Sequence, residues 1–135
     1  MDEKREALVE LKHIHKEFPG VKVLEDISIA FYPGEVHVLL GENGAGKSTI
    51  IKIISGIYQP DKGEVLIEGA PGAKNIREAQ HRGISVIHQE LSVIPDLKVY
   101  ENVFLGREKK KSGFLDKGKM IAECKKILDG MDVAI

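Results

Sequence analysis

The residues best suited to chemistry lie in one glycine-rich stretch, GENGAGKSTI, at residues 41–50. Gly41, Gly46, Lys47 and Ser48 fill a known spacing: a glycine, four residues, a second glycine, a lysine, then serine or threonine. Glycines let backbone N–H groups surround a polyphosphate, because they reach conformations closed to other residues. The lysine then supplies a positive charge to the β- and γ-phosphates, and the serine hydroxyl supplies a ligand for Mg²⁺. The stretch therefore predicts a nucleotide-binding loop.

The flanks of the loop indicate the elements that must position it. Residues 36–40 are apolar apart from His37 and read as a buried strand. Residues 50–54 carry four isoleucines at helical spacing, and Gly56 is placed to end that helix. An ordinary glycine-rich turn before a helix would explain the glycines but not Lys47 or Ser48.

The rest of the chain predicts a mixed α/β domain. Alternating apolar residues and turn signals indicate strands over 7–18, 21–31 and 63–69, with a turn at 18–21. A buried strand is expected at 84–89. Helices are expected at 75–81, from about 99, and at 116–131, where Cys124 would fill an apolar stripe.

Composition limits the function classes. The 135 residues hold 20 basic and 21 acidic side chains, so no overall field would recruit nucleic acid. The N-terminus, MDEKREALVE, is too charged for a signal peptide, and no run of 18 apolar residues occurs. These features predict a cytosolic chain, and the single cysteine leaves no internal disulfide. The basic stretch 107–112 has no interleaved aromatic residue and is expected to be a solvated connection.

Two longer stretches resemble the ATP-binding subunit of ABC transporters. GENGAGKSTIIKIISGIYQPDKGEVLIEG is similar to the family's Walker A segment and the strand after it, and GISVIHQELSVIPDLKVYENVFLGRE is similar to its Q-loop region. The motifs HQEL and ENVFLGRE are similar to those of the ribose, galactose and xylose importers, whose ATPase subunit carries two cassettes. The resemblance runs over nearly all of residues 7–135.

The resemblance implies a fold, namely part of a P-loop NTPase domain of the ABC ATPase type, within the α/β class. An antiparallel β subdomain would comprise about 7–33 and 63–69. A partial RecA-like core would comprise about 34–58 and 84–89. The first part of the helical subdomain would comprise about 95–135.

The resemblance also assigns roles at the ATP site. Phe18 matches the aromatic residue that stacks on adenine, and Val23 the aliphatic residue beside the same ring. The loop over 41–49 binds the phosphates, with Thr49 reaching the α-phosphate. Its remaining members are Glu42, Asn43, Gly44 and Ala45, which are expected to act chiefly through backbone amides. The alternative for Phe18, which the resemblance disfavours, is an aromatic anchor at a strand end.

Gln89 matches the Q-loop glutamine, which would orient the attacking water or contact Mg²⁺. Lys47 and Gln89 are thus the expected catalytic residues, and Ser48 and Gln89 the expected metal ligands. Taken alone, Gln89 reads as a polar end of a strand. Glu90 is not expected to be a general base, because a Walker B strand ends in Asp and Glu, whereas His88 and Gln89 stand here.

Four parts that the family needs are not found in these 135 residues: the signature motif, the Walker B acids, the D-loop and the switch histidine. We therefore expect the first half of a first cassette, which binds ATP or ADP without hydrolysing ATP. In the family, strands that would follow residue 135 lie between the strands at 36–40 and 84–89, so self-association, rearranged strand pairing or marginal stability is expected. The implied partners are a second cassette and transmembrane permease subunits, at the cytoplasmic face of the membrane.

Other function classes remain as alternatives. A stand-alone, non-catalytic nucleotide-binding or regulatory module would share the same loop. A P-loop GTPase or a small-molecule kinase is disfavoured, because no Asn-Lys-x-Asp motif occurs and four arginines are few for a kinase lid.

Overall fold

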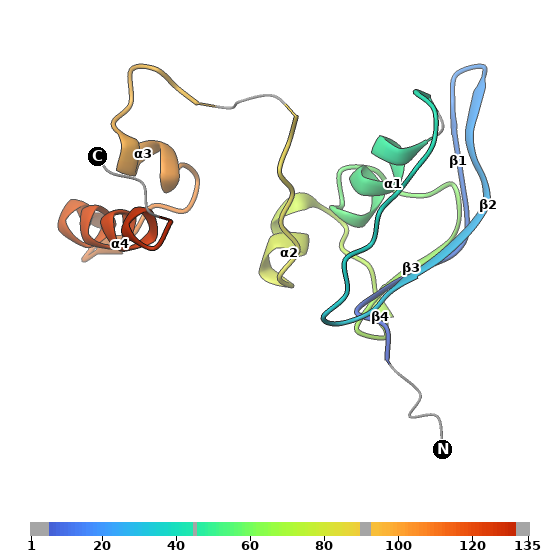
Figure 1. The fold of residues 1–135 in the computed structure, drawn as a ribbon, viewed down its shortest axis with the longest axis horizontal. Coiled ribbons are helices and arrows are strands. Elements are labelled where there is room, and N and C mark those ends of the chain that lie inside the picture. The colour runs from blue at the N-terminus through green and yellow to red at the C-terminus, as the bar shows by residue number, and fades with distance from the viewer. Residues whose placement is uncertain (1–5, 45, 90–92, 132–135) are drawn as a thin grey trace. The chain divides into compact units, whose positions relative to one another are not determined.

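The computed structural model describes residues 6–44, 46–89 and 93–131 (Figure 1). The chain forms two compact units, Met1–Ile87 and His88–Ile135. Each unit is built around its own buried side chains.

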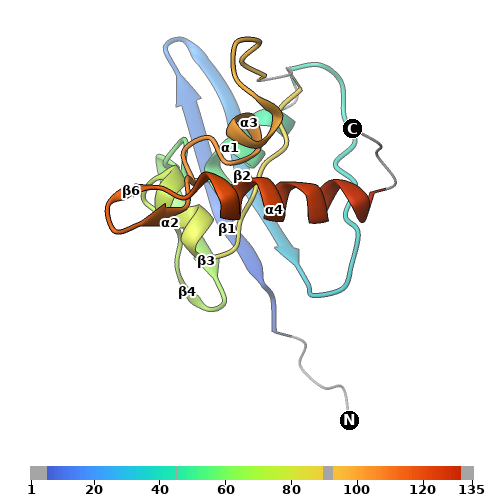
Figure 2. The ribbon, with the colours of Figure 1, turned by 90° about the vertical axis from the view of Figure 1, so that its left-hand side faces the viewer.

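The first unit contains a four-stranded antiparallel sheet in the order β2-β1-β3-β4. Its strands are β1 (Val9–Phe18), β2 (Val21–Phe31), β3 (Lys62–Ile67) and β4 (Ala70–Pro71). The long hairpin of β1 and β2 is seen in both Figure 1 and Figure 2. Its turn is tight because Gly20 adopts a φ of 77°, which closes the pairing of Phe18 with Val21. The predicted antiparallel β subdomain is confirmed.

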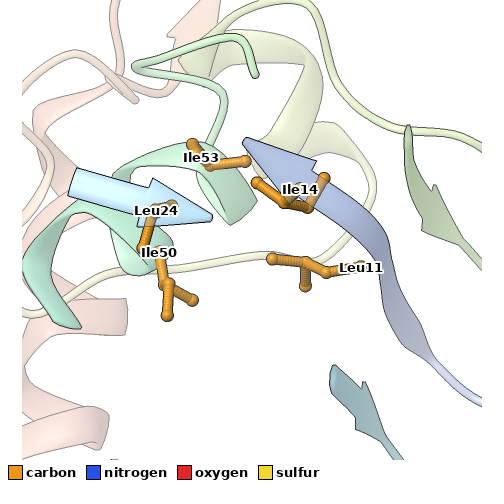
Figure 3. Close-up of a cluster of buried hydrophobic side chains, with 5 residues drawn as sticks. All are labelled: Leu11, Ile14, Leu24, Ile50 and Ile53. Atoms are coloured by element: carbon orange, nitrogen blue, oxygen red, sulfur yellow. The ribbon is translucent and has the colours of Figure 1, made fainter. Parts of the chain in front are cut away.

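Helix α1 (Lys47–Ile54) packs its apolar stripe on this sheet. The buried cluster consists of Leu11 and Ile14 from β1, Leu24 from β2, and Ile50 and Ile53 from α1 (Figure 3). The helix ends as its sequence predicts. Gly56 has a φ of 75°, its N–H donates to Ile53 O (3.1 Å), and Ile57 N–H donates to Lys52 O (2.9 Å). These two bonds form a Schellman motif, which satisfies carbonyls at the end of the helix.

Helix α2 (Ile76–His81) follows the sheet and confirms the helix predicted at 75–81. Asn75 caps it, because its side-chain Oδ1 accepts from Glu78 N–H at 2.9 Å. Arg82, just after the helix, donates to the backbone carbonyls of Ile67 and Pro71. These bonds tie the helix to β3 and β4, over a small cluster of Ile67, Ala73 and Ala79.

The predicted strands at 36–40 and 84–89 do not form. Neither segment belongs to a sheet in the described ranges 6–44 and 46–89. Val36, Val38, Leu40 and Ile87 are 94%, 72%, 89% and 100% exposed, so neither segment is the buried core strand that its pattern predicted. The physical reason is that an apolar pattern favours a strand but supplies no neighbour for its backbone groups.

The second unit contains α3 (Val99–Val103), a short hairpin of β5 (Lys110–Lys111) and β6 (Phe114–Leu115), and α4 (Lys117–Asp129). Phe104, Met120 and Cys124 form its core, so Cys124 does fill an apolar position on a helix. The apolar stripe of α4 is only partly covered, since Ile121 and Ile127 are about half exposed. Residues 107–112, predicted to be a solvated connection, are largely exposed and include β5.

Candidate functional site

The glycine loop leads directly into α1, and Gly46 is the N-cap of the helix with a φ of 85°. Gly44 also has a positive φ, of 90°. An L-amino acid is strained in this region, so both glycines are used for their conformational freedom. The turn places the unpaired N–H groups of the first helical residues, and the positive end of the helix dipole, at the loop. Such an arrangement binds anions, phosphates above all.

Lys47 is folded over the loop. Its ammonium donates to the backbone carbonyl of Gly41 and, at 2.7 Å, to the carbonyl of Glu42. These contacts hold the positive charge among the loop residues, where an anion held by the backbone N–H groups would meet it. Glu42 and Asn43 are exposed, whereas Ala45 lies outside the described residues.

Ser48 and Thr49 follow in the first turn of α1, where Ser48 is exposed and Thr49 partly buried. A serine hydroxyl beside a phosphate-binding loop is a suitable ligand for a hard cation such as Mg²⁺. No group of three or more His, Cys, Asp or Glu side chains among the described residues could hold a metal.

Val23 lies beside the loop. A Cβ placed on Gly46 would lie 3.0 Å from Val23 O and 3.5 Å from Val23 Cγ1. The structure thus brings together two predicted site residues that are 23 positions apart in the sequence. Val23 is partly buried against the core that α1 and the sheet share.

Phe18 lies at the end of β1 and packs against Tyr58. The ring centroids are 5.3 Å apart and the planes meet at 64°, an edge-to-face arrangement. Tyr58 was not among the site residues predicted from the sequence. The only signal for it was an aromatic residue two positions after Gly56, the glycine that ends α1.

Gln89 belongs to the second unit and is exposed there. Glu90, next to it, lies outside the described residues. The loop at 41–49, Phe18 and Val23 all belong to the first unit. The role of Gln89 at the metal and the attacking water stays a prediction.

No helix in the described part of the chain is long and apolar enough to cross a bilayer. The first unit contains a glycine loop at the start of α1, an aromatic pair of Phe18 and Tyr58, and an antiparallel sheet. Together they define a nucleotide-binding protein of the P-loop class, and its solved structural neighbours are ABC ATPase cassettes.

Residues 24–134 match the ABC transporter family, and the chain belongs to that family. It is 46% identical over 129 residues to the ribose import ATP-binding protein RbsA 1 of Rubrobacter xylanophilus, covering 95% of this chain and 26% of that protein. It is 47% identical over 129 residues to the xylose/arabinose import ATP-binding protein XylG of Sulfolobus acidocaldarius, covering 95% of this chain and 51% of that protein. The chain thus spans about a quarter to a half of these relatives.

Among solved structures, the chain is similar to MJ1267, an ATP-binding cassette of an ABC transporter. The TM-score is 0.77 at 28% sequence identity, and the match covers 91% of this chain and 53% of that one. A nucleotide-free ATP-binding cassette from an ABC transporter matches with a TM-score of 0.69, also at 28% identity, over 87% of this chain and 46% of that one. The P-loop NTPase fold predicted from the sequence is confirmed.

Proposed function

We propose that this chain is the ATP-binding portion of an importer ATPase that energises uptake of a ribose-, galactose- or xylose-type sugar. The observation that carries the proposal is the geometry of the loop at 41–48. Two glycines with left-handed backbone conformations, the start of α1 and the Lys47 ammonium all lie in this loop. Relatives with closely similar sequences are ribose and xylose/arabinose import ATP-binding proteins, which supports the sugar class.

Each residue has a distinct task in this proposal. The backbone amides of the loop and the Lys47 ammonium hold the β- and γ-phosphates, and Thr49 reaches the α-phosphate. Ser48 holds Mg²⁺, which neutralises phosphate charge when it is bound. Phe18, with Val23 beside it, offers a flat ring to the adenine, and Gln89 orients the attacking water.

Nucleotide binding without turnover is proposed for residues 1–135 themselves. Hydrolysis needs a group that orients or deprotonates the water, and this sequence contains no Asp-Glu pair at the end of an apolar strand. Lys47, Ser48 and Gln89 supply only part of the machinery. Groups that act as a unit lose most of the rate enhancement when one is absent.

The partners follow from the same assignment. We propose permease subunits in the membrane, a second cassette that completes the ATP site, and a peripheral position at the cytoplasmic face. The two apolar segments at 36–40 and 84–87 are also proposed to pair with a second copy of this chain, since Val36, Val38, Leu40 and Ile87 are largely exposed.

Binding of a fluorescent ATP analogue tests the proposal. The wild-type chain should bind the analogue more tightly with Mg²⁺ than with EDTA, and unlabelled ATP should displace it. Ser48→Ala is the matched variant: it should keep Mg²⁺-free binding and lose most of the gain from Mg²⁺. Binding that ATP does not displace would overturn the proposed function, whereas an unchanged Mg²⁺ effect in Ser48→Ala would overturn only the metal assignment.

A further inference from the structure

The orientation of the Phe18 ring is set by a second aromatic ring. Tyr58 meets it edge to face, with centroids 5.3 Å apart and an angle of 64° between the planes. This geometry is directional, because the positive edge of one ring faces the negative face of the other. The Lys16 ammonium also lies 5.5 Å from the Phe18 centroid, a cation–π distance.

Tyr58 is itself held by the end of the phosphate-loop helix. Its backbone N–H donates to Lys52 O at 3.1 Å, beside the Schellman bond from Ile57 N–H to the same carbonyl. The Lys52 ammonium lies 5.3 Å from the centroid of the Tyr58 ring. Gly56 allows this turn, because a Cβ there would lie 2.7 Å from Asn75 O. Helix α1 therefore begins at the phosphate loop and ends by fixing the ring that packs on Phe18.

Asp61 fixes the backbone that leads to Phe18. Its Oδ1 accepts from Lys16 Nζ at 2.7 Å, and its Oδ2 accepts from Glu17 N–H at 2.7 Å. Its own N–H donates to His15 O at 2.9 Å. One residue thus contacts the three residues that precede Phe18.

These contacts lie where the strand register of the sheet is irregular. The register between β1 and β2 shifts between Lys16 and Glu17, just before Phe18. A regular ladder holds a strand end by evenly repeated hydrogen bonds, and a register shift interrupts them. Asp61 supplies fixed hydrogen bonds at that interruption, and the Lys16 side chain that it binds is only 16% exposed.

We propose that Tyr58 and Asp61 are positioning residues that hold the Phe18 ring ready to stack on the nucleotide base. The inference rests on the proposed function, since it assumes that Phe18 stacks on adenine. A ring fixed before binding loses less conformational freedom when the base arrives, so affinity gains from the preorganisation. Neither residue needs to touch the nucleotide.

Two ligands separate this role from a purely structural one. Mg-ATP carries both a base and phosphates, whereas inorganic tripolyphosphate carries phosphates alone. Tyr58→Ala and Asp61→Ala should each weaken Mg-ATP binding about three- to tenfold and leave tripolyphosphate binding within about twofold, because base stacking alone is disturbed. Tyr58→Phe keeps the ring and should bind like wild type. Asp61→Asn keeps an acceptor for Glu17 N–H and should lose less than Asp61→Ala.

A double-mutant comparison sharpens the test. If Tyr58 and Asp61 act through Phe18, adding Tyr58→Ala to Phe18→Ala should cause no further loss of ATP affinity. The inference would be overturned by additive losses in the double mutant, or by unchanged ATP affinity in both Tyr58→Ala and Asp61→Ala. It would also be overturned if both variants lost as much affinity for tripolyphosphate as for Mg-ATP. A wild-type chain that binds neither ligand would overturn the proposed function as well, so the two failures are distinguishable.

Discussion

Gly46 of the phosphate loop lies directly against Leu24 of β2. A Cβ placed on Gly46 would lie 2.5 Å from Leu24 Cδ2, and Leu24 is only 3% exposed. The loop therefore rests on the same buried cluster that joins α1 to the sheet. Gly46 thus serves packing as well as the phosphate binding proposed above.

Gly46→Ala should destabilise the chain more than Gly44→Ala does. Both positions have a positive φ, but a Cβ on Gly44 meets nothing within 4 Å. The shared backbone strain costs about 1–2 kcal/mol, and displacing Leu24 adds about 1–3 kcal/mol at Gly46 alone. Urea denaturation of the two variants measures the difference. Equal midpoints would mean that the contact with Leu24 carries no packing energy.

The Asp61 carboxylate should make stability depend on pH in the acid range. Hydrogen bonds from the Lys16 ammonium and the Glu17 N–H hold the pKa of Asp61 below its usual value. Because the pKa of Asp61 is lower in the folded state, its ionised carboxylate stabilises the fold at pH values above the unfolded-state pKa, which is about 3.9. That stability is lost as the pH falls through the lower folded-state pKa.

Denaturation of wild type and Asp61→Asn at several pH values checks this. The gap in unfolding free energy should be full at about pH 6 and shrink below about pH 4. Lys16→Met, which removes the ammonium, should show a weaker acid dependence than wild type. A gap that stays constant from neutral to acid pH would contradict the role of the Asp61 charge.

The exposed apolar residues of segments 36–40 and 84–87 should make the chain self-associate. Ile87 is fully exposed, and Val36 is 94% exposed, so both present apolar surface to a second copy. Sedimentation velocity should show a mass that rises with concentration, and Ile87→Lys should lower it. Val21→Lys, on an exposed hairpin residue outside both segments, is the control and should change the mass little. A compact monomer at all concentrations would count against this prediction.

Residues 1–135 should not turn over ATP. In the proposed function Lys47 and Ser48 hold phosphates and metal, but the sequence supplies no Walker B acids to act on the water. Phosphate release with Mg-ATP should equal the background seen with Lys47→Ala. Steady release that disappears in Lys47→Ala would show that the chain contains a complete catalytic site.

The parts of the fold that sequence predicts well are those fixed by neighbours in the chain. The β1–β2 hairpin follows from its alternation and the Pro19–Gly20 turn, and the end of α1 follows from Gly56. The pattern at 36–40 predicted a strand, but strand formation depends on distant partners that local hydropathy does not reveal. The contact of Tyr58 with Phe18 was missed for the same reason, because it joins residues 40 positions apart.

The central claim is that the loop at 41–48 binds the phosphates of a nucleotide, and calorimetric titration with Mg-ATP tests it most directly. Lys47→Ala removes the ammonium now held by the Gly41 and Glu42 carbonyls, whereas Phe18→Ala removes only the stacking ring. Wild type should bind, and Phe18→Ala should bind about 5- to 160-fold more weakly, since stacking contributes about 1–3 kcal/mol per base. Lys47→Ala should bind more weakly still. Equal affinity of wild type and Lys47→Ala would contradict a phosphate-binding role for this loop.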